Sequence, residues 1–296
     1  MPEAKKARGK NAAEFNDTTR SGSNDNAAKP AQKTELLAAI KNALPAFGAD
    51  RFTLGEEEIR ATPNQKELMR LVKTKDVVFV NGPFGTGKTF WTCLAALQGL
   101  AEKKYNKISL TAPAVGADED IGFLPGTKDD KMAEHVNQIL ETIEDLVGKQ
   151  IAASLREAGL VEIAPHGFNR GRTYKKTFYI LDESQNASAR QLMTSLGRLG
   201  HGSTFVYMGD DKQNDRTTGR SAFVSFMDRF NRAAYAEEIG AITLGKEDVR
   251  RHPLLKKIVE NGDDRSLDGF EDRGDSRPSR QLRPAKGNSD FPNLKP

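Results

Sequence analysis

The chain of 296 residues has one cysteine, Cys93, and therefore cannot form an internal disulfide. A lone cysteine fits a reducing compartment. No apolar run approaches the roughly 20 residues that cross a membrane. The first residues, "MPEAKKARGKNAAEF", lack the apolar segment of a signal peptide. We therefore expect a cytoplasmic protein without a membrane partner.

Histidine is scarce too, and neither sign of charge is in large excess. The four histidines and the cysteine show no zinc-ligand spacing. The net charge of +4 is small for a chain with 29% charged residues. This charge slightly favours anionic partners. A solvated surface slightly richer in lysine and arginine explains it equally well.

The two ends of the chain are poor in apolar residues. Residues 1–33 are rich in Ala, Asn, Asp, Ser and Lys, and 263–296 in Arg, Asp, Gly, Ser and Pro. Such compositions predict disordered tails. The second tail has another interpretation, as a basic segment that binds nucleic acid. Apolar residues at helical spacing begin in 34–47, so we expect one folded domain over 34–262.

Five short β-rich runs lie within this domain. Stretches with helical patterns, such as "TFWTCLAALQGLAEK" and "ARQLMTSLGRLG", separate most of them. This alternation predicts an α/β fold with a mostly parallel sheet between helices. The interval 114–177 is too long for a simple crossover and is expected to hold an insertion with a helical stretch around 129–158. The predicted strands are 77–80, 108–111, 178–181, 204–208 and 241–244.

The first predicted strand runs into "GPFGTGKT" (82–89), which satisfies the phosphate-loop pattern G-x-x-x-x-G-K-[ST]. Glycines let backbone N–H groups turn toward phosphates, and the start of the following helix adds partial positive charge. Lys88 is expected to reach the β- and γ-phosphates, and the hydroxyl of Thr89 to bind Mg²⁺. The predicted nucleotide-binding residues of this segment are Gly82, Pro83, Phe84, Gly85, Thr86, Gly87, Lys88, Thr89 and Phe90.

An acidic pair follows the third predicted strand in "FYILDES" (178–184). The strand would deliver both carboxylates to its carboxyl end, beside the phosphates. We expect Asp182 to hold Mg²⁺, directly or through water, and Glu183 to act as general base for the attacking water. The alternative is an acidic strand end in an ordinary loop, but the order after a complete phosphate loop favours the catalytic interpretation.

Two glutamines complete the predicted site for ATP and Mg²⁺. "VYMGDDKQND" (206–215) places Gln213 after another apolar strand. If that strand lies beside the acidic pair, the Gln213 amide would come near the γ-phosphate and could sense it. A plain polar turn is the alternative. "ATPNQKEL" (61–68) places Gln65 ahead of the phosphate loop, where its amide would both donate to and accept from the adenine edge. Taken alone, it is only the first turn of a helix.

In this order, the motifs resemble the PhoH-like family of P-loop ATPases from about 62 to 259. The resemblance implies a single RecA-like P-loop NTPase core related to superfamily 1 helicases. It also implies a homo-oligomer such as a hexameric ring, and roles linked to RNA. The most specific stretches are "GFLPG" (122–126), "PHGFNRGRT" (165–173), "FYILDESQN" (178–186), "GRLGHGS" (197–203) with "GDDKQND" (209–215), and "EDVRRHPLLKKIV" (247–259).

Arginines in these motifs are the remaining catalytic predictions, because ATP hydrolysis gains most from a cation at the γ-phosphate. The leading ones are Arg251 in "RRHPL" and Arg172 in "RGRT". Each is expected as an arginine finger, in cis or from a neighbouring subunit, with a packing or surface arginine as the alternative. The chain departs from the family in "TAPAVGADE" (111–119), where Ala112 replaces an arginine.

Three functions are weighed on these grounds. The first is an ATPase that acts on RNA or single-stranded DNA, for which basic residues at 103–107 and 170–176 are further support. The second, a complete superfamily 1 helicase, needs two RecA-like cores, and the roughly 80 residues after "GDDKQND" leave no room for another. The third is a nucleotide-gated regulatory or binding protein with little hydrolysis, against which the retained Glu183 argues.

Overall fold

The computed structural model describes residues 30–45, 51–54, 57–113, 128–164, 171–213 and 221–249. The first helix, α1 (Pro30–Ala43), begins ahead of the predicted boundary at residue 34, so the prediction of a disordered segment is wrong for 30–33. Proline suits the first helical position because its missing N–H is not needed there. The buried side chains of Leu37 and Ile40 then hold the helix on the core. The rest of both predicted tails lies outside the described residues.

Six parallel strands form one sheet in the order β5-β4-β6-β7-β3-β8. The α/β fold with a parallel sheet is therefore confirmed, as are the five predicted strands. A sixth strand, β5, was missed because "VEI" is only three residues long and lies inside the predicted insertion. The strands are β3 (Val77–Asn81), β4 (Lys107–Thr111), β5 (Val161–Ile163), β6 (Thr177–Leu181), β7 (Thr204–Gly209) and β8 (Ile239–Thr243).

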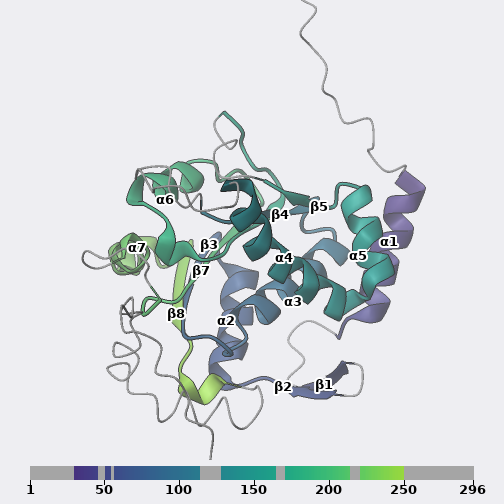
Figure 1. The fold of residues 1–296 in the computed structure, drawn as a ribbon, viewed down its shortest axis with the longest axis horizontal. Coiled ribbons are helices and arrows are strands. Elements are labelled where there is room, and N and C mark those ends of the chain that lie inside the picture. The colour runs from purple at the N-terminus through teal and green to yellow at the C-terminus, as the bar shows by residue number, and fades with distance from the viewer. Residues whose placement is uncertain are drawn as a thin grey trace, which may run out of the picture. The chain divides into compact units, whose positions relative to one another are not determined.

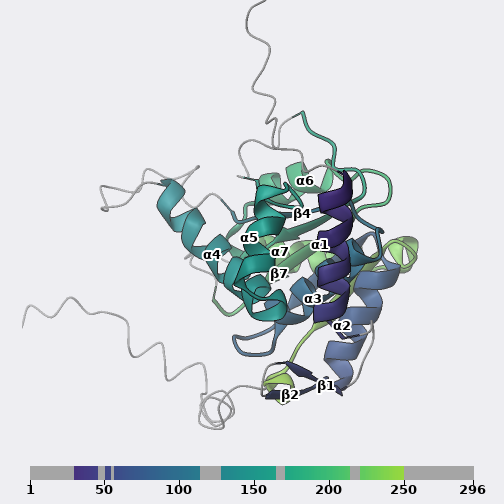
Figure 2. The same ribbon diagram turned by 90° about the vertical axis from the view of Figure 1, so that its right-hand side faces the viewer.

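Helices cover both faces of this sheet, because alternate residues of each strand point to opposite faces. Val78 and Val80 of β3 pack in one core with helices α1 to α5, whereas Val77 and Phe79 pack in a second core with α6 and α7. Figure 1 shows α6 and α7 on one side and α1 and α5 on the other, and Figure 2 shows α1 beside α3. The remaining helices are α2 (Pro63–Thr74), α3 (Lys88–Ala101), α4 (Lys128–Val147), α5 (Lys149–Glu157), α6 (Ala189–Leu196) and α7 (Ala222–Phe230).

The insertion predicted over 114–177 contains α4, α5 and the edge strand β5. The helical stretch expected around 129–158 is confirmed, but as two helices. They are divided at Gly148, whose φ of 85° lies in the left-handed region that glycine adopts readily. Three short 3₁₀ turns, η2 (Ser184–Asn186), η3 (Ala233–Tyr235) and η4 (Lys246–Asp248), complete the connections described.

A two-stranded antiparallel hairpin, β1 (Arg51–Leu54) and β2 (Glu57–Arg60), precedes α2. Phe52 of this hairpin meets Trp91 of α3 edge to face, with ring centroids 6.0 Å apart. Trp91 is the only tryptophan of the chain and is buried. No described helix combines the length and the apolar character that crossing a membrane requires.

Candidate active site

The loop between β3 and α3 has the conformation that its glycines favour. Gly85 and Gly87 have φ values of 79° and 85°, in the left-handed region. A Cβ atom on Gly87 would lie 3.0 Å from the Trp91 indole, so a larger residue would be crowded as well as strained. The loop therefore leads directly into the amino end of α3, where free backbone N–H groups and the helix dipole favour an anion.

Lys88, the first residue of α3, folds back into this loop. Its ammonium donates to the carbonyl oxygens of Gly82 and Pro83, the latter at 3.1 Å. Burial lowers the pKa of Lys88, and the charges of nearby carboxylates act in the opposite direction. Within the described part of the chain, no carboxylate forms an ion pair with this ammonium. A phosphate group would supply the counter-charge that Lys88 lacks. The carboxylates that act on it are Asp210, Asp182 and Glu183.

The predicted acidic pair lies at the carboxyl end of β6. Asp182 is 6% exposed, and its Oδ1 accepts a hydrogen bond of 3.0 Å from the backbone N–H of Glu183. Glu183 has a φ of 52°, a left-handed conformation that a residue with a Cβ rarely adopts. Strained backbone of this kind is concentrated at functional sites. Since only β7 separates β6 from β3, the pair lies about 10 Å across the sheet from the start of the phosphate loop.

The loop after β7 fills the space between these two segments. The N–H of Gly82 donates to the carbonyl oxygen of Gly209 at 3.1 Å, and the side-chain oxygen of Asn81 accepts from the N–H of Asp211 at 3.1 Å. Asp210 is 5% exposed, and burial raises its pKa. β7 and β6 are neighbours in the sheet, which is the condition on which the prediction for Gln213 depends. Gln213 has an exposed side chain at the end of the loop, and its contact with a γ-phosphate stays a prediction.

Gln185 connects the acidic pair to the loop after β7. The side chain is 1% exposed. Its Nε2 donates to the carboxylate of Glu183 at 2.6 Å and to the carbonyl oxygen of Gln213 at 3.4 Å, and its Oε1 accepts from the N–H of Asp210 at 3.1 Å. One buried amide thus fixes the orientation of the predicted general base relative to the predicted sensor loop.

Sequence reasoning missed both Gln185 and Asn81 as site residues. Each is a single polar residue at the end of an apolar strand or just after one, a position that also suits an ordinary turn. Their contacts depend on β7 lying between β3 and β6, which the sequence did not reveal. The only signal available was the position of Gln185 directly after the acidic motif.

Gln65 has its amide engaged within the protein. It is 1% exposed and forms a capping box at the start of α2, in which its Oε1 accepts from the N–H of Thr62 at 2.9 Å. Its Nε2 donates to the carbonyl oxygens of Thr86, at 2.9 Å, and Asp248, at 3.0 Å. Both amide hydrogens are therefore used. Contact with adenine stays a prediction, and it requires Gln65 to give up one of these partners or to offer its second oxygen lone pair.

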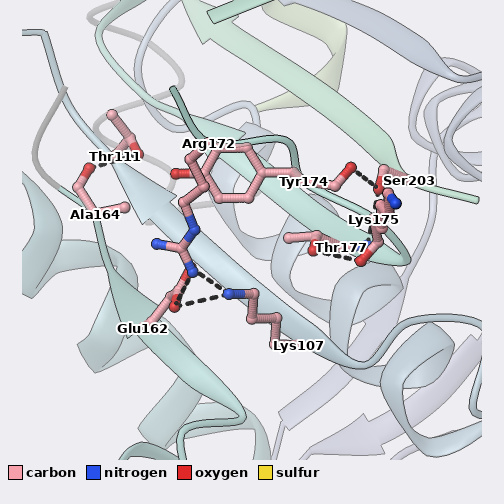
Figure 3. Close-up of polar contacts among 9 residues, drawn as sticks. All are labelled: Lys107, Thr111, Glu162, Ala164, Arg172, Tyr174, Lys175, Thr177 and Ser203. Carbon is pink, nitrogen blue, oxygen red and sulfur yellow. Dashed lines mark hydrogen bonds and ion pairs between the residues drawn. The ribbon is translucent and has the colours of Figure 1, made fainter. Parts of the chain in front are cut away.

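Of the two predicted arginine fingers, Arg172 lies within the described residues and Arg251 does not. Arg172 donates to Glu162 of the edge strand β5 at 3.0 Å, and its guanidinium lies 5.0 Å from the centre of the Tyr174 ring. Figure 3 shows Arg172 and Lys107 converging on the same carboxylate. Because β5 lies four strands from β3, or about 19 Å, this placement argues against Arg172 acting in cis. Arg251 lies outside the described residues.

The residues present fit a nucleotide with Mg²⁺. Free N–H groups and Lys88 would bind the phosphates, while the hydroxyl of Thr89 and the carboxylate of Asp182 are the hard oxygen ligands that Mg²⁺ prefers. No group of three or more His, Cys, Asp or Glu side chains within the described ranges could hold a metal ion alone.

A glycine-rich loop between a buried parallel strand and a helix, facing acidic residues at the end of a nearby strand, defines a P-loop NTPase core. The chain belongs to the PhoH-like family, since residues 59–262 match the sequence profile described as "PhoH-like protein". Curated relatives include a PhoH-like protein of Bacillus subtilis, 37% identical over 67% of this chain and 62% of its own length. Protein PhoH of Escherichia coli is 35% identical over 66% of this chain and 55% of its own length.

These alignments span less than two thirds of each relative, so they extend to the shared core and not to whole-protein activities. Among solved structures, the Pif1 helicase from Candida albicans matches 71% of this chain and 47% of its own, with 18% identity and a TM-score of 0.35. A likeness at that level supports no conclusion about this chain.

Proposed function

We propose that this protein is a Mg²⁺-dependent ATPase that couples ATP hydrolysis to RNA or single-stranded DNA. The observation that carries the proposal is Lys88. Its partly buried ammonium is held inside a glycine-rich loop, near three carboxylates but paired with none of the described ones. The family supports a P-loop NTPase in general, whereas the choice of ATP, its hydrolysis and the nucleic acid belong to the proposal.

In the proposed mechanism, the loop N–H groups and Lys88 bind the phosphates and orient the terminal one. Glu183 accepts the proton of the attacking water, and Gln185 holds that carboxylate through the 2.6 Å hydrogen bond. Gln213 contacts the γ-phosphate from the loop after β7. Mg²⁺, when bound by Thr89 and Asp182, would neutralise charge on the β- and γ-phosphates. Arg251 is retained as an arginine finger.

Replacing Glu183 tests hydrolysis separately from binding. Glu183→Gln should lower kcat at least about 100-fold, the lower range for a general base, while nucleotide affinity stays within a few-fold. Binding is measured through the emission of Trp91, the sole tryptophan, which packs against the phosphate loop at Gly87. Lys88→Ala is the matched variant that should lose affinity itself.

Absence of hydrolysis in the wild-type chain, with Mg²⁺ and with or without RNA, would exclude the ATPase. If ATP still bound and changed the affinity for a partner, the second candidate, a nucleotide-gated regulatory protein, would stand instead. Rates with RNA, with single-stranded DNA and with no polymer test the coupling.

The base selection and the assembly need their own measurements. Competition between ATP and GTP tests Gln65, because Gln65→Ala should erase any preference for adenine if the amide reads the base. Light scattering gives the mass in solution, with and without nucleotide, and tests the proposed homo-oligomer and its hexameric form. Mixing Arg251→Ala chains with Glu183→Gln chains tests a finger donated between subunits. In a mixed assembly, the intact Arg251 of one chain can act on the site that keeps Glu183 in the other, so ATP hydrolysis should return.

A further inference from the structure

Two lysine-bearing loops meet at the amino ends of β4 and β6. One carries Lys103 and Lys104, and the other carries Lys175 and Lys176. β4 and β6 are neighbours in the sheet, and the N–H of Asn106 donates to the carbonyl oxygen of Lys176 at 2.6 Å. Segments that lie far apart in the sequence therefore form one surface. Because all strands of the sheet are parallel, this surface lies at the amino ends of the strands, whereas the phosphate loop lies at their carboxyl ends.

Three of these lysines present charge that the described protein does not neutralise. Lys103, Lys175 and Lys176 are exposed, and none forms an ion pair with another described residue. The nearest cations of the same region differ in this respect. Lys107 and Arg172 both pair with Glu162, at 2.9 and 3.0 Å.

Lys104 contributes less to this surface. Its ammonium donates to the carbonyl oxygen of Lys73 at 3.0 Å. Burial lowers its pKa, against the opposing charges of Asp76 and Glu102. We therefore assign the surface to Lys103, Lys175 and Lys176, and name these three residues the amino-edge lysines.

The loop with Lys175 and Lys176 is fixed on both sides. The hydroxyl of Ser203 donates to the carbonyl oxygen of Tyr174 at 2.8 Å and accepts from the N–H of Thr177 at 2.9 Å (Figure 3). The N–H of Lys176 also donates to the carbonyl oxygen of His201. A loop held in this way presents its charges with little ordering cost on binding.

The backbone at two of the amino-edge lysines is strained. Lys103 has a φ of 60° and Lys176 a φ of 46°, and the described residues contain just one other non-glycine residue at positive φ, Glu183. Glycine or asparagine suits such a conformation better than lysine does. At Lys103 this conformation closes the C-terminus of α3, where the N–H groups of Lys103 and Lys104 donate to the carbonyl oxygens of Leu100 and Gly99 at 3.0 and 2.9 Å. The turn itself does not require a lysine side chain, so the charge can be removed without removing the turn.

We infer that the amino-edge lysines bind the phosphate backbone of single-stranded nucleic acid, on the sheet edge opposite the candidate active site. The large apolar side chains that are exposed in the described part, Phe84, Ile163, Met193 and Tyr235, all lie outside these loops. Without an aromatic platform for bases, recognition is through phosphates, insensitive to sequence and strongly dependent on salt. The inference rests on the proposed nucleic acid partner but not on ATP hydrolysis.

The test uses the full chain and the variant Lys103→Asn/Lys176→Asn. Asparagine removes each charge and accepts the left-handed backbone, so the thermal midpoint should match or exceed that of wild type. Binding of a fluorescent oligouridine and an oligodeoxythymidine is followed by anisotropy between about 50 and 200 mM salt. Each lysine lost should change the slope of log K against log salt by about 0.7 for single strands. The double variant should therefore lose about 1.4 from the slope, so that fourfold more salt weakens wild type about sevenfold more than the variant.

Lys41→Gln/Lys149→Gln is the matched control, since it removes the same charge from exposed positions on α1 and α5. The inference predicts a wild-type slope for this control. Equal slopes in the two variants, or equal competition by polyglutamate and RNA, would overturn it. RNA-stimulated ATP hydrolysis that is indifferent to the amino-edge lysines would overturn it too and leave the proposed function standing. Lysine-dependent binding without ATP hydrolysis would support the inference and reject the proposed function.

Discussion

Replacing Gln185 with leucine should separate hydrolysis from nucleotide binding. The amide donates to the carboxylate of Glu183 at 2.6 Å and accepts from the N–H of Asp210 at 3.1 Å. Leucine is similar in size but can do neither. The first loss leaves the general base free to turn, and the second leaves a buried N–H without its acceptor.

The two losses differ in what they affect. A hydrogen bond to a charged group contributes about 1.5–3 kcal/mol, which corresponds to a fall in kcat of about 10- to 150-fold if the bond is needed to hold Glu183 in the transition state. The unsatisfied N–H of Asp210 costs about 1–3 kcal/mol of folding stability. Nucleotide affinity should change little, because Gln185 does not belong to the phosphate loop.

Steady-state ATP hydrolysis, Trp91 emission on nucleotide binding and urea unfolding measure the three quantities. Gln185→Glu is a second variant, because its carboxylate still accepts from the N–H of Asp210 while repelling Glu183. It should lose as much kcat as leucine, and the buried unpaired charge should lower stability as well. Gln150→Leu, at an exposed position on α5, is the control. A wild-type kcat in Gln185→Leu, or equal losses of kcat and affinity, would refute the positioning role.

Three further changes test buried groups of the fold, two beside the candidate site and one at the amino end of β4. Gly209→Ala would place a Cβ 2.9 Å from the Gln185 Oε1 and 3.0 Å from the Phe223 ring, so we expect lower kcat and a lower thermal midpoint, and wild-type values of both would contradict the crowding. Asp248→Ala removes a buried carboxylate that accepts from Thr62, Asn64 and the N–H of Gly245. The free energy of unfolding, measured in urea, should fall by about 2–4 kcal/mol. A fall below about 1 kcal/mol would show that water satisfies the three donors instead. Burial raises the pKa of Tyr105 to about 12 from its usual value near 10. Because the fold favours the neutral phenol, the contribution of Tyr105 to folding stability is complete below pH 10 and is lost between about pH 10 and 12. Tyr105→Phe should flatten the thermal midpoint over that window relative to wild type, and parallel curves would refute the assignment.

The elements that could be predicted are those in which one local signal is enough. Buried strands such as 77–80 and 178–181 are short apolar runs. A phosphate loop is recognised from sequence because its glycines are required by the backbone conformation of the loop. β5 escaped because an edge strand of three residues carries almost no periodicity. Gln185 and Asn81 escaped because their partners are set by the order of strands, which the sequence does not state.

Strand order also bears on the prediction that Arg172 is an arginine finger. Arg172 lies in a family motif and carries the right charge for a finger, but its loop leads into the amino end of β6. There it pairs with Glu162 on the edge strand and packs over Tyr174. This placement argues against a finger acting in cis, and a finger donated to a neighbouring subunit stays a prediction.

β6 joins the two surfaces proposed for this protein. Its carboxyl end leads into Asp182 and Glu183, and its amino end follows Lys176, so the five residues between them span about 17 Å. All five are buried, and both neighbouring strands are parallel to β6 over its length. Such a strand does not stretch or shift in register at small cost, since a slip would move its side chains to the wrong face. Coupling between ATP and nucleic acid would therefore proceed through movement of the loops at either edge or between subunits. It follows that loss of the amino-edge lysines should weaken nucleic acid binding while the ATPase rate without polymer stays at the wild-type value.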